Sequence, residues 1–274
     1  MTAVLSASPA SPADLLCGGP LALLAQAGAV AGRFQDDGWG IACYRGGVPS
    51  VVKSTRPARL EQARFRAAAA RARATLSVAH LRDASNPAGL PKASLVSAAN
   101  TQPFSAGGFV FAHNGTLFIK DEIKSLLGRY AARVKGTNDS EVLFWQVMKM
   151  LEAYGSPEAA LEAALDEIRT VWISCRDKYP GRPAPYRGLN IFLASPGSLT
   201  VLCHYQPHKE GSKAALLTPG WEFGRMAWRR EKSRIIFSSE PADGGPWKKM
   251  RDPEIASASL SSGKLRLSFK RIKL

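Results

Sequence analysis

The sequence predicts an α+β fold in which helices cover β-sheets. Short β-type runs recur along the 274 residues, and several of them follow one another closely, which favours antiparallel pairing. These runs are 48–53, 75–81, 108–114, 189–195, 199–205, 234–240 and 264–269. Helical segments at 58–73, 139–154 and 157–176 are interspersed among them, a pattern typical of layered domains.

Two apolar stretches contain turn signals. LNIFLAS (189–195) and LTVLCHY (199–205) are separated by Pro-Gly-Ser, so we predict a hairpin with Pro196 and Gly197 in its turn. FVFAHNGTL (109–117) allows two interpretations. Asn-Gly is a frequent hairpin turn, but an Asn side-chain amide and a Gly backbone N–H can also point at one oxygen, as in an oxyanion hole.

The predicted helices rest on composition and capping signals. Residues 58–73 are rich in Ala and Arg, which have high helix propensity. Asn138 can cap a helix that runs to about Tyr154, with Glu141 as its capping-box partner. Residues at helical spacing predict an apolar face on this helix. That face includes, or lies next to, Val142, Trp145, Met148 and Leu151.

The sequence has a clear boundary between two predicted helices but no signal that divides the chain into domains. Gly155 would end the helix at 139–154, and Ser156-Pro157 would begin the next one, with Pro at its first position. We find no repeat at a fixed period and no linker rich in Gly, Ser or Pro. We therefore predict a single domain over residues 1–274.

Composition indicates a cytoplasmic protein. Hydrophobic residues make up 45% of the chain, enough for a sizeable core, and no apolar run is long enough to span a bilayer. The N-terminus MTAVLSASPASPADLL lacks the basic and long apolar regions of a signal peptide. The four cysteines are far apart and form no Cys-x-x-Cys pair, which favours reduced thiols.

The formal net charge of +15 raises the question of an acidic partner. Basic residues concentrate in 53–73, in 225–234 and in the last eleven residues. Such a field attracts nucleic acid or acidic proteins. The sequence shows no RNA-binding aromatic signature, zinc finger or basic zipper. We therefore favour a solvated basic surface, with an acidic protein partner as the second interpretation and nucleic acid as the third.

Five ordered segments carry polar residues next to apolar runs. They are DDGWGIACY (36–44), AHLRDAS (79–85), NTQPF (100–104), AHNG (112–115) and GTNDSE (136–141). Taken singly, each has an ordinary explanation. Asp37-Gly38 suits a turn, Arg82 a surface ion pair, and Asp139 a helix N-terminus, where the dipole favours a carboxylate.

Taken together, the five segments resemble the class II glutamine amidotransferase domain. They are most similar to its stand-alone subfamily, which includes ergothioneine-pathway and glutathione-degrading γ-glutamyl hydrolases. IIFSSEPADGGPWKK (235–249) is also similar to that subfamily, so the resemblance covers nearly the whole chain. It implies an αββα sandwich of two antiparallel sheets, the fold of the N-terminal nucleophile hydrolases.

The resemblance also implies roles for individual residues. Arg82 would hold the α-carboxylate of a glutamine-like substrate, since a guanidinium fork binds it bidentately. Asp139 would accept from the α-ammonium group. Asn114 and Gly115 would form the oxyanion hole at the γ-carbonyl.

Other residues of the matching segments would line the same site. Asp37, Gly38 and Trp39 would shape the wall near the nucleophile, and His113 would belong to the substrate pocket. The resemblance implies no metal and no organic cofactor.

The sequence departs from the family pattern at the nucleophile. The family has Cys directly after the initiator Met, whereas this chain has Thr2; it also has Gln102 where the subfamily has His. In one interpretation Met1 is removed and Thr2 attacks, with its own amine as base. In another the site is a relic that binds a glutamyl group without cleaving it. An altered residue at this position is a third alternative.

The sequence thus predicts an amidohydrolase that cleaves the γ-amide of glutamine or of a γ-glutamyl conjugate through an acyl-enzyme on Thr2. The alternative is a catalytically inactive binding or partner subunit of the same fold. The expected ligand is a glutamyl small molecule. A synthase or an acidic protein is kept as a partner, and no membrane partner is expected.

Overall fold

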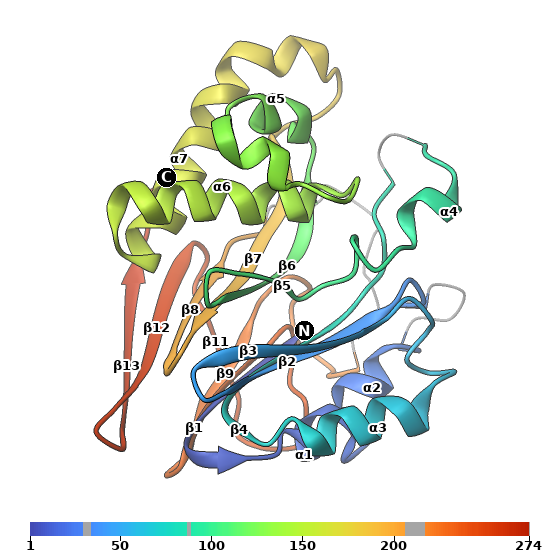
Figure 1. The fold of residues 1–274 in the computed structure, drawn as a ribbon, viewed down its shortest axis with the longest axis vertical. Helices are drawn as coiled ribbons and strands as arrows, with labels where there is room; N and C mark the ends of the chain where they lie inside the picture. The colour runs from blue at the N-terminus through green and yellow to red at the C-terminus, as the bar shows by residue number, and fades with distance from the viewer. Residues whose placement is uncertain (30–33, 87–88, 206–216, 274) are drawn as a thin grey trace.

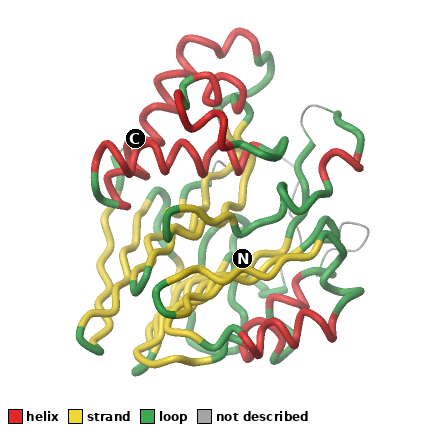
Figure 2. The backbone as a smooth tube through the Cα atoms, viewed as in Figure 1, coloured by secondary structure: helices red, strands yellow, loops and turns green. Residues whose placement is uncertain are grey.

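The computed structural model describes residues 1–29, 34–86, 89–205 and 217–273. Two antiparallel sheets lie face to face between two groups of helices (Figures 1 and 2). The predicted α+β class and the αββα sandwich are therefore confirmed.

The first sheet has the strand order β11-β9-β10-β1-β4-β2-β3. Its strands, in chain order, are β1 (Thr2–Ala10), β2 (Trp39–Arg45), β3 (Val48–Ser54), β4 (Ala74–Leu81), β9 (Ala227–Arg230), β10 (Arg234–Ser238) and β11 (Lys248–Lys249). The start of the chain lies in the middle of this sheet, because β1 pairs with both β4 and β10.

The second sheet has the order β13-β12-β8-β7-β6-β5. Its strands are β5 (Phe104–Ala106), β6 (Phe109–Leu117), β7 (Tyr186–Ser195), β8 (Ser198–Cys203), β12 (Glu254–Ser261) and β13 (Lys264–Arg271). The β7–β8 hairpin turns at Pro196-Gly197, since Ser195 pairs with Ser198, and the predicted hairpin is confirmed.

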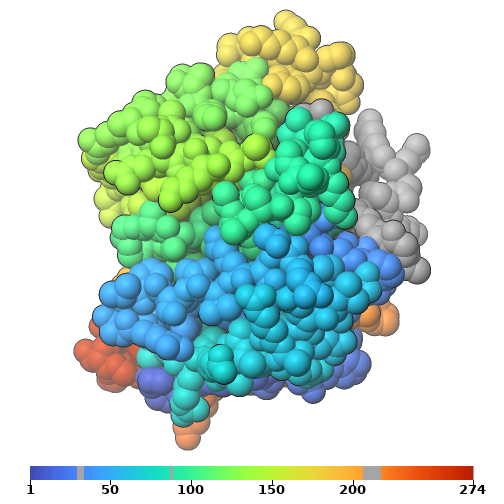
Figure 3. Space-filling model, turned by 45° about the vertical axis from the view of Figure 1, so that its right-hand side comes forward, coloured from blue at the N-terminus to red at the C-terminus, as the bar shows by residue number. Residues whose placement is uncertain are grey.

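Helices cover the outer face of each sheet. The group on the first sheet is α1 (Ala13–Cys17), α2 (Leu23–Gln26) and α3 (Gln62–Arg71). The group on the second is α5 (Lys120–Ser125), η1 (Gly128–Arg133), α6 (Asp139–Tyr154), α7 (Pro157–Cys175) and η2 (Arg176–Lys178). The two groups lie at opposite ends of the molecule in the space-filling view (Figure 3). The short helix α4 (Lys92–Leu95) lies in the connection between β4 and β5 (Figure 1).

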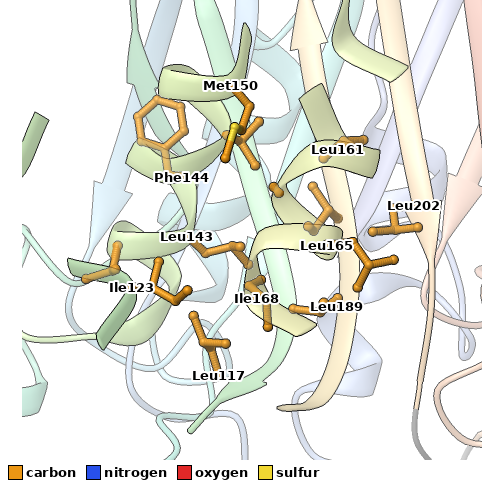
Figure 4. Close-up of a cluster of buried hydrophobic side chains, with 14 of the residues drawn as sticks. Leu117, Ile123, Leu143, Phe144, Met150, Leu161, Leu165, Ile168, Leu189 and Leu202 are labelled. Carbon is orange, nitrogen blue, oxygen red and sulfur yellow. The ribbon is translucent and has the colours of Figure 1, made fainter. Parts of the chain in front are cut away.

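Each interface between layers has its own apolar core. The largest lies between α5–α7 and the second sheet, where Leu143 and Ile168 meet Leu117 and Leu189 (Figure 4). Another fills the space between the sheets, around Phe192 and Phe237. Burial of these side chains is the main force holding the layers together.

Two of the three predicted helices have the expected bounds, and the third is shorter. Helices α6 and α7 match 139–154 and 157–176 to within a residue. The helix expected at 58–73 begins at Gln62 instead. The preceding residues form a turn closed by the Glu61 N–H on the Pro57 carbonyl, and the Glu61 carboxylate is bound by Ser54 and Trp39.

The capping of α6 is only half as predicted. Asn138 accepts from the Glu141 N–H at 2.9 Å, which confirms the cap. The Glu141 carboxylate, however, binds the N–H groups of Lys135 and Gly136 in the preceding loop, and the Asn138 N–H donates to Asn100. The reciprocal capping-box bond is therefore absent from the described structure.

The apolar face of α6 is also rotated from the predicted one. Leu143, Val147 and Met150 are buried together with Val142, whereas the other three predicted positions are partly buried and pack at the margin. Those three are Trp145, Met148 and Leu151.

The hairpin interpretation of FVFAHNGTL is wrong. Residues 109–117 form one continuous strand, β6, paired with β7 along its length. Gly115 is needed there because a Cβ atom on it would collide with the Gly188 carbonyl of the neighbouring strand. Asn-Gly thus marks a close approach of two backbones rather than a turn.

The four cysteines are free thiols, and three of them are buried. Within the described ranges, no helix is long and apolar enough to cross a bilayer.

Candidate functional site

A cavity of about 250 Å³ opens where the two sheets end near the start of the chain. The first sheet contributes the end of β4 and the residues that follow β4 and β10, and the second contributes residues of β6 and β7. The N-terminus of α6 closes a further side. The lining residues include Met1, His80, Arg82, Asn114, Asp139 and Ser239.

Arg82 provides a buried cation in this cavity. Its backbone N–H donates to the Gly38 carbonyl and its carbonyl accepts from the Asp37 N–H, which holds the end of β4 against the segment before β2. The side chain is only 4% exposed, and one guanidinium nitrogen donates to the Asp37 carbonyl at 3.3 Å. Burial lowers the pKa of Arg82, while nearby carboxylates, among them Asp139, oppose that shift.

Asp139 provides a buried carboxylate in the same cavity. It is the first residue of α6 and is 8% exposed. One carboxylate oxygen accepts from the Leu117 N–H at 2.6 Å, at the end of β6. The cavity therefore offers one cation and one anion at fixed positions.

Asn114 presents its amide between the two sheets. Its Oδ1 lies 3.0 Å from the His80 Nε2 atom, and its Nδ2 donates to the Ser239 hydroxyl at 2.8 Å. The same hydroxyl lies 2.8 Å from the terminal amine of Met1. Asn114 thus directs an N–H donor towards the start of the chain.

His80 fixes the orientation of that amide. Its Nε2 faces two oxygen acceptors, Asn114 Oδ1 and the His113 carbonyl, so the proton belongs on Nε2. Its Nδ1 is buried with no hydrogen-bond partner. Burial, with the nearby terminal amine, lowers the pKa of His80 well below its usual value. His80 is therefore a neutral donor that holds Asn114 Oδ1 and leaves Nδ2 facing the cavity.

His113 and Gln102 support the strand that carries Asn114. The His113 ring binds the Ser140 hydroxyl and the Gly188 carbonyl, both at 3.0 Å. The Gln102 side chain pairs with the His113 backbone, accepting from its N–H at 2.6 Å and donating to its carbonyl at 3.1 Å. The Gln that replaces the subfamily His thus bonds through both its amide oxygen and its amide nitrogen to the strand that carries Asn114.

The start of the chain lies in the cavity with Met1 in place. Burial lowers the pKa of the Met1 amine to about 5, against the opposing effect of Glu240. The Met1 carbonyl accepts from the Ser239 N–H at 2.9 Å. Thr2 is 1% exposed and is absent from the lining; its hydroxyl lies 3.0 Å from that of Ser238.

Three residues expected at the wall lie behind it. Asp37, Gly38 and Trp39 are absent from the cavity lining. Asp37 and Gly38 hold the Arg82 backbone, as described above, and the Trp39 ring packs edge-on against Phe65 under the first sheet. Asp37 also holds the lining residue Ala84, whose N–H donates to the Asp37 carboxylate at 2.8 Å.

The sequence predicts one site for Arg82, Asp139, Asn114, Gly115 and His113, and the cavity lining contains all five. The motifs give no role to several other residues of the site, although some of these residues lie within them: His80 lies in AHLRDAS, and Ser238, Ser239 and Glu240 lie in FSSEP. Arg187 and Asn190, in β7, carried no sequence signal.

Comparison with known proteins identifies the family of this chain. The family model described as glutamine amidotransferases class-II matches residues 1–177. This chain belongs to that family. No curated protein matches the sequence.

Solved structures share the fold of this family member. A glutamine aminotransferase class-II domain protein from Silicibacter pomeroyi is 18% identical, with a TM-score of 0.63 and 97% of each chain covered. Glutamine phosphoribosylpyrophosphate amidotransferase from B. subtilis is 12% identical, with a TM-score of 0.60. That match covers 97% of this chain but 48% of the other. The fold is thus that of the N-terminal nucleophile hydrolases.

Proposed function

We propose that this protein hydrolyses the γ-amide of glutamine or of a γ-glutamyl conjugate. One observation carries the proposal: a single cavity brings Arg82, Asp139 and the Asn114 amide together around the start of the chain. Membership of the class-II glutamine amidotransferase family supports an amide-hydrolysing activity in general.

The charged pair suits the head group of a glutamyl ligand. The Arg82 guanidinium would bind the α-carboxylate. Asp139 would accept hydrogen bonds from the α-ammonium group with the carboxylate lone pairs that the Leu117 N–H does not occupy. Both groups are buried and held by backbone contacts, so they are ordered before the ligand arrives.

The Asn114 amide suits the developing oxyanion. In the described structure its N–H donates to Ser239 beside the chain start. A substrate carbonyl oxygen at that point would receive this N–H and the Gly115 backbone N–H. Such preorganised donors act mainly in the transition state.

Thr2 would be the nucleophile after removal of Met1. An N-terminal amine then adjoins the Thr2 hydroxyl and can take its proton. A neutral amine is the form that accepts a proton at pH 7.

A binding-only role is the second candidate. With Met1 present, the Thr2 hydroxyl bonds to Ser238 and does not reach the cavity wall. A chain that keeps Met1 would bind a glutamyl ligand without cleaving it.

We also propose that residues 1–274 form one cytoplasmic domain. The first sheet combines strands from both ends of the chain, since β1 and β10 are neighbours. A synthase remains one proposed partner, and an acidic protein at the basic surface remains another.

Processing of the N-terminus tests the choice between the two candidates. We expect the intact mass of the native protein to lack Met1, because only then does Thr2 carry a free amine. The same sample should release ammonia from glutamine. Full retention of Met1 in a host with normal methionine removal would exclude Thr2 as the nucleophile.

His80→Ala is expected to lower kcat by roughly fivefold with little change in KM. It removes one hydrogen bond, worth about 1 kcal/mol, and frees the Asn114 amide to rotate. His80→Gln should restore part of the rate, because its amide can donate to Asn114 Oδ1. In an Asn114→Ala background the His80 change should cost nothing further; additive losses would contradict this positioning role.

A further inference from the structure

The cavity extends to a second side, away from Arg82. In the first sheet β1 lies between β4 and β10, so the chain start separates Arg82, which follows β4, from Ser239 and Glu240, which follow β10. In the second sheet β7 lies on the side of β6 opposite β5. A ligand with its head group at Arg82 and its γ-carbonyl at Asn114 would point its leaving group towards β7 and β10.

Arg187 provides a cation on that second side. It lies in β7 where the pairing with β6 shifts: Gly188 pairs with Thr116 and Tyr186 with Leu117, which leaves Arg187 unpaired. Its half-buried side chain lines the cavity. No hydrogen bond, ion pair or ring contact joins the Arg187 side chain to another residue within the described ranges.

The wall around Arg187 is fixed and largely neutral. The Asn190 amide donates to the Gly224 carbonyl at 2.7 Å and accepts from the His204 N–H at 3.0 Å. The Tyr205 ring packs directly over Gly188 and Gly224, where a Cβ atom would collide with it. The Phe223 ring meets the Tyr205 ring edge-on, with centroids 5.4 Å apart.

The carboxylates that line the cavity leave Arg187 unpaired. Asp139 is bound to the β6 backbone. Glu240, on the β10 side, accepts from the Leu217 N–H at 3.2 Å, and its burial raises its pKa. Asp83, next to Arg82, lies on the head-group side. A half-buried guanidinium that has no counter-charge among the described residues of its cavity is suited to an anionic group of a ligand.

We propose that Arg187 binds a carboxylate on the leaving group, so that the substrates are γ-glutamyl conjugates of an amine that itself carries a carboxylate. The inference rests on the proposed function. In the reaction the γ-carbonyl C–N bond breaks, the amine leaves with a proton, and water cleaves the Thr2 ester to give glutamate. Free glutamine has no group to place at Arg187 and should be the poorer ligand.

Two ligands that differ only in charge test this assignment. γ-Glutamylglycine ends in a carboxylate, and γ-glutamylglycinamide ends in a neutral amide of nearly the same shape. Binding is measured by calorimetry in a Thr2→Ala background, which cannot form the acyl-enzyme. We expect the anionic ligand to bind about tenfold to a hundredfold more tightly than the neutral one. Arg187→Ala should remove this difference, and Arg187→Lys should keep part of it.

Arg182→Ala is the matched control. Arg182 precedes the same strand, is exposed, stacks on Phe118 and is absent from the cavity lining, so its loss should leave the preference unchanged. Equal binding of the two ligands, an equal loss for both in Arg187→Ala, or no binding of either would overturn the inference. A charge preference without hydrolysis of either ligand by the Thr2 protein would instead remove the proposed activity and leave Arg187 as a binding determinant.

Discussion

Thr2→Ala is expected to abolish hydrolysis of glutamine and γ-glutamyl amides, with a loss of at least about a thousandfold in kcat. The hydroxyl is the attacking atom in the proposed mechanism, and the alanine variant would still offer a free amine but no nucleophile. The measurement is ammonia release from glutamine, made on protein whose intact mass shows that Met1 has been removed.

Two further variants separate the strength of the nucleophile from its position. Thr2→Cys supplies the thiol that the family has at this place, and we expect it to raise the rate, since a thiolate is intrinsically more nucleophilic than a hydroxyl. Thr2→Ser keeps a hydroxyl and should retain activity. If Thr2→Ala is as active as the parent protein, Thr2 is not the nucleophile. An inert but folded Thr2→Cys protein would favour the binding-only role.

The fold was predictable where the sequence has local signals. Helices α6 and α7 begin at the capping residues Asn138 and Ser156, whose side chains accept from the N–H groups of Glu141 and Ala159. The β7–β8 turn is marked by Pro196-Gly197. These contacts span only a few residues, so their energies depend little on the rest of the chain.

Elements whose structure depends on residues far away in the chain were harder to predict from the sequence. β1 contains Ser and Pro, and its strand conformation is stabilised by β4 and β10 on either side of it. The α6 face is rotated because it packs on a sheet whose position the helix sequence does not encode. The start of α3 depends on the contacts of the Glu61 carboxylate with Trp39, which is 22 positions away, and with Ser54, which is seven positions away.

The candidate site was predictable through its motifs but not through its geometry. The order of the segments brought Arg82, Asn114 and Asp139 to one expected site. Nothing in the sequence shows that Ser239 joins Asn114 to the chain start across 125 positions, or that Arg187 faces the same cavity from an unpaired place in β7. Both arise from strand register, which forms only when the sheets pair.

Arg82→Ala is expected to weaken ligand binding, whereas Asn114→Ala is expected to lower kcat. Arg82 would contact the ground-state ligand through charge-assisted hydrogen bonds, each worth about 1.5–3 kcal/mol, so its loss should weaken binding of glutamate or a γ-glutamyl compound by about tenfold to a hundredfold. Arg82→Lys should also be costly, because a point charge cannot reproduce the guanidinium fork. Asn114→Ala should leave binding nearly unchanged and lower kcat by about a hundredfold to a thousandfold.

Calorimetry and steady-state kinetics on the same preparations separate these effects, since an oxyanion donor acts on the transition state and a head-group clamp on the bound ligand. Asp139→Asn belongs with Arg82→Ala: it keeps an acceptor for the Leu117 N–H while removing the charge that would face the α-ammonium group. If the parent protein binds no glutamyl ligand, or if Arg82→Ala and Asp139→Asn bind it as tightly as the parent does, the cavity does not hold a glutamyl head group. The family membership would then describe the fold alone, and the basic surface would become the place to look for function.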